Sequence, residues 1–420
     1  MRRPAGDLRF LHISPILPSK SGNGLAMRAS VFSEALGQLG HLSVAALGAP
    51  GTKPAHSADQ TFSLSTDGRL DTVMSLIANM LPSSERTAKL MAYGVPPGAI
   101  AWSLPVVTEL KKILDSQRWD AICLTRADLL VLETRYNLFP TSTPLIVDLD
   151  DDDSAYHKQL AEASSLNDHT VAEWHSAVGQ VYENLIIQAA PRVAIFTCAT
   201  ETGATSLRQK TGCEQIFVLE NSIGSVAGAK FSPSANTILF VGNLGYRPNI
   251  DGIGWFLEEI WPKLRSSDVS LNLEIAGSSP SPDLRSQCHD AGAVLYPDPL
   301  SLGTLYQRAG VAIVPLRFGS GSRIKILEAG AHCVPVVSTS LGADGLGLNS
   351  TRDYFGADTA SDFVEQCHLA LNQRSLSRRR TDALASQIRS RFERDVSVAK
   401  LRAHIFEALA EKPLGSGPIN

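Results

Sequence analysis

Residues 311–338 read VAIVPLRFGSGSRIKILEAGAHCVPVVS. The apolar run Val311–Val314 predicts a strand, and the apolar stripe between Arg323 and Ala331 predicts a helix after a glycine-containing loop. A second apolar run, Pro335–Ser338, predicts another strand. A strand, a helix and a strand in this order form a parallel crossover unit. The stretch therefore predicts a parallel sheet covered by helices.

The same alternation extends from this stretch in both directions. Further strands are predicted at residues 8–13, 42–47, 121–124, 145–147, 193–197, 238–241, 271–276 and 294–296. Helical stripes with i, i+3, i+4 spacing are formed by Phe32, Ala35, Leu36 and Leu39, and by Ile253, Leu257, Ile260 and Leu264. Such stripes mark the core-facing side of a helix. The fold class predicted is α/β, with two doubly wound domains.

The small and polar stretch 222–236 is the natural place for a linker. We expect a first domain over residues 1–221 and a second over residues 237–395. Residues 396–420 are expected to form a helix that returns to the first domain, followed by a short tail. In such sheets ligands bind beyond the carboxyl ends of the strands. We therefore expect the active site in a central cleft that both domains face.

Composition excludes several classes of protein. The chain has 420 residues, of which 44% are hydrophobic and 19% charged, as is typical of globular proteins. A formal net charge of −4 gives no support to a nucleic-acid partner. The six cysteines show no C-x-x-C spacing, which argues against a metal cluster. With no signal-peptide pattern and no long apolar run, we expect a reduced, cytoplasmic protein.

The loop before the helix at Arg323 suits a diphosphate. Its glycines let backbone amides approach a ligand closely, and the helix N-terminus offers free N–H groups. Arg323 and Lys325 add positive charge to the same turn. The alternative is a plain turn with solvated basic residues.

Glu328 falls on the apolar stripe of the same helix, with Ile324, Leu327 and Ala331. A carboxylate on a buried face is costly unless it is paired or hydrogen-bonded. Two ribose hydroxyls would supply suitable donors. The alternative is an ordinary i, i+3 pair with Lys325 on an exposed face.

Several motifs resemble retaining glycosyltransferases of family 4, which have the GT-B fold. In chain order they are ATE at 199–201, LENSI at 219–223, ILFVGNL at 238–244, RPNID at 247–251, GSGSRIKILEA at 319–329 and VPVVSTSLGADGL at 334–346. The resemblance is strongest over residues 238–346. It implies transfer of a sugar, with retention, from a nucleoside-diphosphate sugar to a saccharide or lipid-linked acceptor, without a metal or other cofactor.

The resemblance also implies roles for particular residues. Glu328 would hold the ribose, and Arg323 or Lys325 would face the diphosphate. These three form the expected catalytic set. The expected donor-binding residues are Gly242, Asn243, Arg247, Gly319, Ser320, Gly321 and Ser322.

The sequence departs from the family's pattern at three positions. Ser320 stands where the family often has a Glu, Asn243 where it has an Arg, and Cys333 where it has a Gly. Charge at the diphosphate then falls to Arg323, Lys325 or Arg247. The missing acid leaves open a non-catalytic, transferase-like subunit. A nucleotide-sugar 2-epimerase is a second alternative, but the loop lacks the carboxylates and His that it would need.

The loop after the first predicted strand resembles the family's acceptor-side glycine loop. Its candidate residues are Gly22, Asn23 and Gly24, and Arg28 lies one turn into the following helix. The alternative is a flexible turn with an exposed Arg.

An acidic run, 148–153, follows the predicted strand 145–147. An Asp-x-Asp pair could hold Mg²⁺ or Mn²⁺, as in the GT-A fold, or an Asp run could begin a helix. Because the second half carries a donor site of the metal-independent type, we predict no metal. We expect Asp148, Asp150 and Asp151 to contact acceptor hydroxyls. Arg126 is a further cleft candidate because it follows a predicted strand, and His157 is a weaker one.

The helical segment 374–402 is rich in arginine, with an apolar stripe at Leu384, Ile388 and Phe392. A solvated helix face is the simpler interpretation. The alternative is a weak peripheral contact with anionic lipid at the inner face of a membrane.

Overall fold

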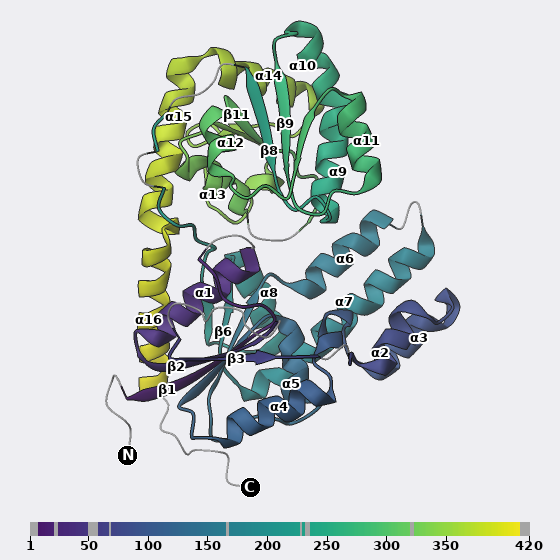
Figure 1. The fold of residues 1–420 in the computed structure, drawn as a ribbon, viewed down its shortest axis with the longest axis vertical. Coiled ribbons are helices and arrows are strands. Elements are labelled where there is room, and N and C mark those ends of the chain that lie inside the picture. The colour runs from purple at the N-terminus through teal and green to yellow at the C-terminus, as the bar shows by residue number, and fades with distance from the viewer. Residues whose placement is uncertain are drawn as a thin grey trace. The chain divides into compact units, whose positions relative to one another are not determined.

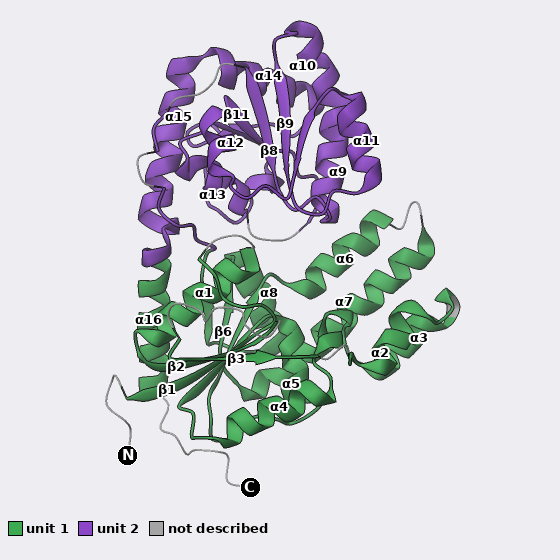
Figure 2. Cartoon of the chain, viewed as in Figure 1, with its two compact units in different colours: residues 1–220, 320–322, 397–420 green, residues 221–319, 323–396 purple. Residues whose placement is uncertain are grey.

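The computed structural model describes residues 7–20, 24–48, 58–66, 69–164, 168–226, 229–231, 236–319 and 323–411. These residues form two compact units (Figure 2). The first contains the described residues up to 220 and those from 397 onward, and the second contains 221–319 and 323–396. The described residues of the predicted linker, 222–226, 229–231 and 236, all belong to the start of the second unit.

The first unit is built on a sheet of seven parallel strands in the order β3-β2-β1-β4-β5-β6-β7 (Figure 1). The strands are β1 (Leu8–Ser14), β2 (Gly40–Leu47), β3 (Gln60–Leu64), β4 (Ala121–Thr125), β5 (Leu145–Asp150), β6 (Val193–Cys198) and β7 (Ile216–Val218). Each strand pairs with its neighbours in parallel, because every connection between them crosses over the sheet.

Helices cover both faces of this sheet. They are α1 (Gly24–Gly37), α2 (Thr72–Asn79), α3 (Ser83–Tyr93), α4 (Leu104–Asp115), α5 (Val131–Thr134), α6 (Asp153–Ser164), α7 (His169–Ala189), α8 (Glu201–Thr211) and α16 (Arg394–Glu411). Along β1 the side chains alternate between two cores. Leu11 and Ile13 join the core under α4 and α7, whereas Phe10 joins the core under α1 and α16. In that second core α16 contributes Val398 and Leu401.

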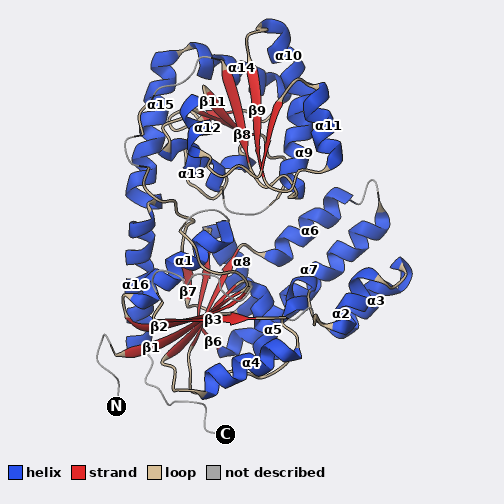
Figure 3. Ribbon diagram, viewed as in Figure 1, coloured by secondary structure: helices blue, strands red, loops and turns tan. Residues whose placement is uncertain are grey.

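The second unit has six parallel strands in the order β10-β9-β8-β11-β12-β13 (Figure 3). They are β8 (Thr237–Val241), β9 (Asn272–Gly277), β10 (Val294–Pro297), β11 (Val311–Val314), β12 (Val336–Ser338) and β13 (Phe355–Gly356). Its helices are α9 (Arg247–Trp255), α10 (Trp261–Ser267), α11 (Pro282–Asp290), α12 (Gly303–Arg308), α13 (Ile324–Ala331), α14 (Ala360–Asn372) and α15 (Arg374–Gln387). Both predicted doubly wound domains are therefore confirmed.

One local prediction needs correction, and one strand was not predicted. The strand predicted at 145–147 continues to Asp150 as β5. Residues Pro97–Ala101 form a 3₁₀ helix. Strand β3 lies at the sheet edge in a region whose pattern predicted no strand, and of its residues only Leu64 is buried. Apolar periodicity does not detect strand positions that are occupied by ion-paired aspartates, as at the end of β5. It also misses an edge strand such as β3, whose side chains are partly in contact with water.

The remaining whole-chain expectations concern membranes and thiols. No helix in the described ranges is long and apolar enough to cross a membrane. All six cysteines are free thiols. In α15 the residues Arg374, Arg378 and Arg379 are exposed, whereas Arg380 packs over the ring of Phe355 at 4.2 Å. Part of the basic segment thus has a packing role.

Candidate functional site

The strand order indicates where a ligand would bind at each sheet. In each sheet the chain adds strands first on one side of its first strand and then on the other. This reversal of strand order lies between β1 and β4 in the first unit and between β8 and β11 in the second. In doubly wound sheets, ligands bind beyond the carboxyl ends of the strands at this switch point. The loops after these four strands are therefore the places to look for chemistry.

In the second unit, the loop after β8 is packed too tightly for a side chain. A Cβ atom added to Gly277, at the end of β9, would lie 1.6 Å from the carbonyl oxygen of Gly242. A Cβ atom on Gly242 would lie 2.8 Å from Cε of Lys325 and 2.9 Å from Nδ2 of Asn249. Glycine at position 242 thus makes room for Lys325 to reach the end of β8.

The next residues of this loop close on themselves. The side-chain oxygen of Asn243 accepts a hydrogen bond from the amide of Gly245 at 2.9 Å. The carbonyl of Asn243 accepts one from Nδ2 of Asn249 at 2.8 Å. Asn243 therefore shapes the turn, and Arg247, at the start of α9, is exposed.

The basic residues before and within α13 lie at the same edge. Arg323 is 8% exposed and donates a hydrogen bond to the carbonyl of Gly319 at 3.0 Å. Gly319 has φ = +108°, a conformation that favours glycine. Lys325 makes no hydrogen bond or ion pair with any described residue. Its burial lowers the pKa of the ammonium to about 8. Ser320, Gly321 and Ser322 lie outside the described residues.

Glu328 is held by a residue from another helix. The hydroxyl of Tyr306, in α12, donates to Oε2 of Glu328 at 3.1 Å. Burial raises the pKa of the carboxyl, and the hydrogen bond from Tyr306 acts in the opposite direction. The alternative of an exposed pair with Lys325 holds only in part: Glu328 is partly buried and its hydrogen bond comes from Tyr306, while the nearby charge of Lys325 also lowers the pKa of the carboxyl.

The apolar stripe of α13 differs from the prediction. The buried residues are Ile326, Leu327, Ala329 and Gly330, whereas Ile324, Ala331 and Glu328 are only partly buried. The physical reason is that α13 packs on two sides. It contacts β11 and β12 on one side, and α15 on the other, where Leu384 lies against Gly330. Glu328 lies at the margin between buried and open surface.

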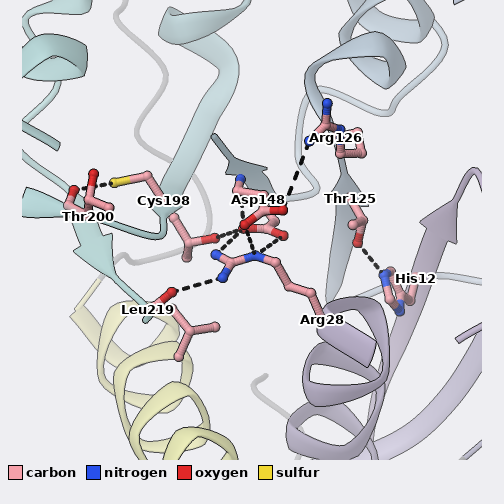
Figure 4. A network of polar contacts seen from close by, with 10 residues as sticks. His12, Arg28, Thr125, Arg126, Asp148, Cys198, Thr200 and Leu219 are labelled. Carbon is pink, nitrogen blue, oxygen red and sulfur yellow. Dashed lines mark hydrogen bonds and ion pairs between the residues drawn. The ribbon is translucent and has the colours of Figure 1, made fainter. Parts of the chain in front are cut away.

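In the first unit, the acidic run forms an ion network with basic residues (Figure 4). Arg28 binds Asp148 through two hydrogen bonds, Nε–Oδ2 at 2.8 Å and Nη2–Oδ1 at 2.7 Å. It also donates to the carbonyl of Leu219 at 2.9 Å, and Thr197 donates to Asp148 at 2.8 Å. Arg28 is 3% exposed and Asp148 fully buried, so the alternative of an exposed Arg is wrong.

The ends of β4 and β5 are joined by a second set of charges. Arg126 and Asp150 both have positive φ, +88° and +59°, which is uncommon for residues other than glycine. Arg126 contacts Asp153 at 2.6 Å and Asp150 at 3.9 Å, and Arg28 contacts Asp150 at 3.3 Å. Strained backbone held by buried ion pairs is common at binding sites.

Asp151 differs from its neighbours in the acidic run. Lys210 pairs with Asp152 at 2.6 Å, so four of the five aspartates from 148 to 153 have a basic partner. Asp151 makes no hydrogen bond or ion pair with any described residue. Burial and the charge of Asp150 raise the pKa of its carboxyl to about 7. Among described residues, no group of three or more His, Cys, Asp or Glu could hold a metal ion.

Other N-terminal candidates have simpler surroundings. Gly22 and Asn23 lie outside the described residues, and Gly24 is the half-buried first residue of α1. His157 contacts His175, with 3.0 Å between the Nδ1 atoms, and stacks on Tyr182. Burial lowers the pKa of His157 to about 4, which keeps it neutral.

Sequence reasoning missed three residues that shape these edges. Tyr306 lies on an apolar stripe with Leu302 and Leu305, and a tyrosine there needs a partner for its hydroxyl. Asn249 lies four residues before Ile253 on the buried face of α9, and this polar residue on an apolar face was a usable signal. His12, fully buried in β1, lies between Ser33 at 2.9 Å and Thr125 at 2.6 Å. Only the fold reveals those two partners.

Residues 235–372, which contain the second-unit edge, match the family model described as glycosyl transferases group 1. A curated Klebsiella pneumoniae relative is 31% identical over 128 residues, or 29% of this chain. That relative is named an uncharacterized 44.6 kDa protein in the cps region, and the match spans 33% of its length. The second unit is similar to group 1 glycosyl transferases.

Solved structures resemble the chain over most of its length. Sucrose-phosphate synthase from Thermosynechococcus elongatus has a TM-score of 0.67 at 11% identity, covering 96% of this chain and 100% of that one. S. aureus TarM has 0.66 at 9% identity, covering 94% and 98%. Anabaena HepE in complex with UDP and glucose has 0.62 at 14% identity, covering 97% and 100%. These similarities show that the fold is GT-B.

Proposed function

We propose that this protein transfers a glycosyl group from a nucleoside-diphosphate sugar to a hydroxyl of a saccharide or lipid-linked acceptor, with retention of anomeric configuration and without a metal. The observation that carries the proposal is the second-unit edge. There Glu328, Lys325 and Arg323 gather at the carboxyl ends of β8 and β11, within the segment that matches glycosyl transferases group 1.

The donor would be held by its ribose and by its diphosphate. A partly buried carboxylate such as Glu328 favours hydroxyl donors, and a ribose offers two of them. Lys325 lies beside Gly242 and makes no hydrogen bond or ion pair with a described residue, so its ammonium is available to bind a phosphate. Arg323 adds a second charge in the same turn. Cations fixed at a diphosphate stabilise the negative charge that develops as it leaves.

In the transfer, the bond from the anomeric carbon to the diphosphate breaks and the acceptor oxygen forms a new bond to that carbon. The acceptor's proton would leave with the nucleoside diphosphate, whose phosphate oxygen can accept it. This route assigns the cations to the leaving group and requires no protein carboxylate as nucleophile.

On the acceptor side we propose Asp151. The other aspartates of the run are occupied by Arg28, Arg126 and Lys210. Asp151 alone keeps both oxygens without a described partner, so it can accept a hydrogen bond from a saccharide hydroxyl.

The donor assignment is tested with Glu328→Ala. We expect loss of most binding of UDP, GDP or ADP sugars, measured by calorimetry, with an unchanged melting temperature. The control is Glu365→Ala, an exposed residue of α14. Unchanged nucleotide affinity in Glu328→Ala would remove the ribose role. Tight binding of a nucleotide sugar by the wild type without any turnover would favour a non-catalytic subunit.

The acceptor assignment is tested with Asp151→Asn. We expect the KM for the acceptor to rise about tenfold, while donor affinity stays at its wild-type value. The matched control is Asp115→Asn, an exposed residue at the end of α4. Equal acceptor KM values for Asp151→Asn and wild type would show that Asp151 does not contact the acceptor.

A weak contact with anionic lipid is a further part of the proposal, with the protein at the cytoplasmic face of a membrane. The exposed Arg374, Arg378 and Arg379 of α15 would carry it. Co-sedimentation with vesicles containing phosphatidylglycerol should then weaken when all three are replaced by Ala.

A further inference from the structure

Tyr306 occupies an unusual place beside the donor edge. It lies in the short helix α12 and is 2% exposed. Its ring stacks on His332 at a centroid distance of 4.8 Å and an interplanar angle of 12°. His332 caps the C-terminal end of α13, the helix that carries Glu328. The Tyr306 ring thus packs against the end of α13, and its hydroxyl donates a hydrogen bond to Glu328 of the same helix.

The direction of the hydrogen bond is set by chemistry. Burial and the nearby Glu328 carboxyl raise the pKa of the Tyr306 phenol well above its ordinary value. The phenol therefore keeps its proton at any ordinary pH. A protonated phenol beside a carboxylate donates, and Glu328 accepts through Oε2 at 3.1 Å.

This hydrogen bond involves only one of the two carboxylate oxygens of Glu328. No described residue donates to Oε1 of Glu328, and that oxygen is not among the fully buried partnerless atoms of the chain. One oxygen of Glu328 is tied to α12, and the other stays accessible to a ligand. A long side chain held at one oxygen also loses rotamer freedom before a ligand arrives.

We propose that Tyr306 is a positioning residue that presets Glu328 for a ribose hydroxyl. The proposal rests on the proposed function, because it takes Glu328 as the ribose-binding group. Tyr306 itself would touch neither the nucleotide nor the sugar. It would act by ordering the carboxylate and by favouring its ionised form, against the effect of burial. The site would thereby select ribonucleotides over their deoxy forms.

The test is Tyr306→Phe, which removes the hydroxyl and keeps the stacked ring. Affinities for UDP, GDP and ADP are measured by calorimetry, and the nucleotide that the wild type binds best becomes the probe. We expect its Kd to rise about tenfold in Tyr306→Phe. The preference for the ribonucleotide over its 2′-deoxy and 3′-deoxy forms should shrink toward the value of Glu328→Ala. With a substrate in hand, the donor KM should rise and kcat should change little.

The matched control is Tyr354→Phe. Tyr354 is also a buried tyrosine of the second unit, at 4% exposure. Removing the Tyr354 hydroxyl should leave both the nucleotide affinity and the preference for the ribonucleotide unchanged. A purely structural role for Tyr306 would lower the melting temperature without changing the ribose preference, and that result would overturn the proposal.

Failure of the inference and failure of the proposed function give different results. If Glu328→Ala loses affinity and ribose preference but Tyr306→Phe keeps both, the proposed function stands and Tyr306 is not a positioning residue. If the wild type binds none of the three nucleotides, or Glu328→Ala binds like the wild type, the ribose role fails and the inference falls with it.

Discussion

The carboxyl edges of the two sheets have the same topology and opposite arrangements of charge. In the first unit, Arg28 forms ion pairs with Asp148 and Asp150, and Arg126 forms one with Asp153. In the second unit, Lys325 has no described ion-pair partner, and Glu328 is held by a neutral phenol. Strand order thus locates an edge, but the pairing of its charges decides what the edge can do.

The physical difference lies in where the countercharge comes from. A buried ion pair whose charges satisfy each other stabilises the backbone that it joins, and it offers little to a ligand. A partly buried ammonium that forms no direct ion pair is costly until an anion binds it. The charges of the first edge are therefore paired within the protein, whereas the second edge leaves Lys325 for the anionic ligand that we propose.

The largest effect should come from breaking the first-unit network. Arg28→Ala leaves the Asp148 carboxylate buried without its partner, and we expect a loss of about 3–5 kcal/mol in the free energy of unfolding. Urea denaturation measures it. Arg378→Ala is the control, because this exposed Arg pairs with an equally exposed carboxylate, Asp382. A loss no larger than that of the control would show that the network is not needed for folding, and the contrast between the edges would fail.

A smaller effect, on binding alone, is expected from Gly242→Ala. The new Cβ would meet Cε of Lys325 at 2.8 Å, and the flexible Lys side chain must move away. We expect donor affinity to fall about tenfold, or about 1.4 kcal/mol, with little change in melting temperature. Gly254→Ala serves as the control, since its Cβ would enter open space on α9. Wild-type affinity in Gly242→Ala would place Lys325 away from the donor.

The smallest effect should be a pH dependence of donor binding. Burial lowers the pKa of Lys325 to about 8, so the ammonium loses its proton as pH rises through that value. An anionic donor binds the charged form, and affinity should therefore fall severalfold between pH 7.5 and 9.5. Lys325→Arg keeps its charge over this range, and its affinity should stay flat. An alkaline fall of the same size in Lys325→Arg would assign the titration to another group.

Part of the second-unit edge could be predicted from the sequence. Lys325 drew attention because it follows a glycine loop at a helix start, and Glu328 because it falls among apolar residues, although the buried face of α13 differs from the predicted stripe. The partner of Glu328 could not be found in this way. Tyr306 is 22 residues distant in the chain, and only the packing of α12 against the sheet brings the two side chains together.

For the first-unit edge the sequence was less informative. The acidic run drew attention to Asp148 and Asp150, but it gave no sign that Arg28, 120 residues earlier, would occupy them. It also placed the end of β5 too early, because paired aspartates inside a strand look like a loop. That Asp151 alone lacks a described partner became visible only in three dimensions.

The sequence by itself determined the α/β class, the two doubly wound domains, the strand β11 and the helix that carries Glu328. These follow from local periodicity and from short spacings, which the chain carries wherever it folds. Only the tertiary structure decided which charges neutralise each other and which stay open to a ligand. The reason is that pairing depends on distances between segments far apart in the chain, and burial then sets how much each pair contributes.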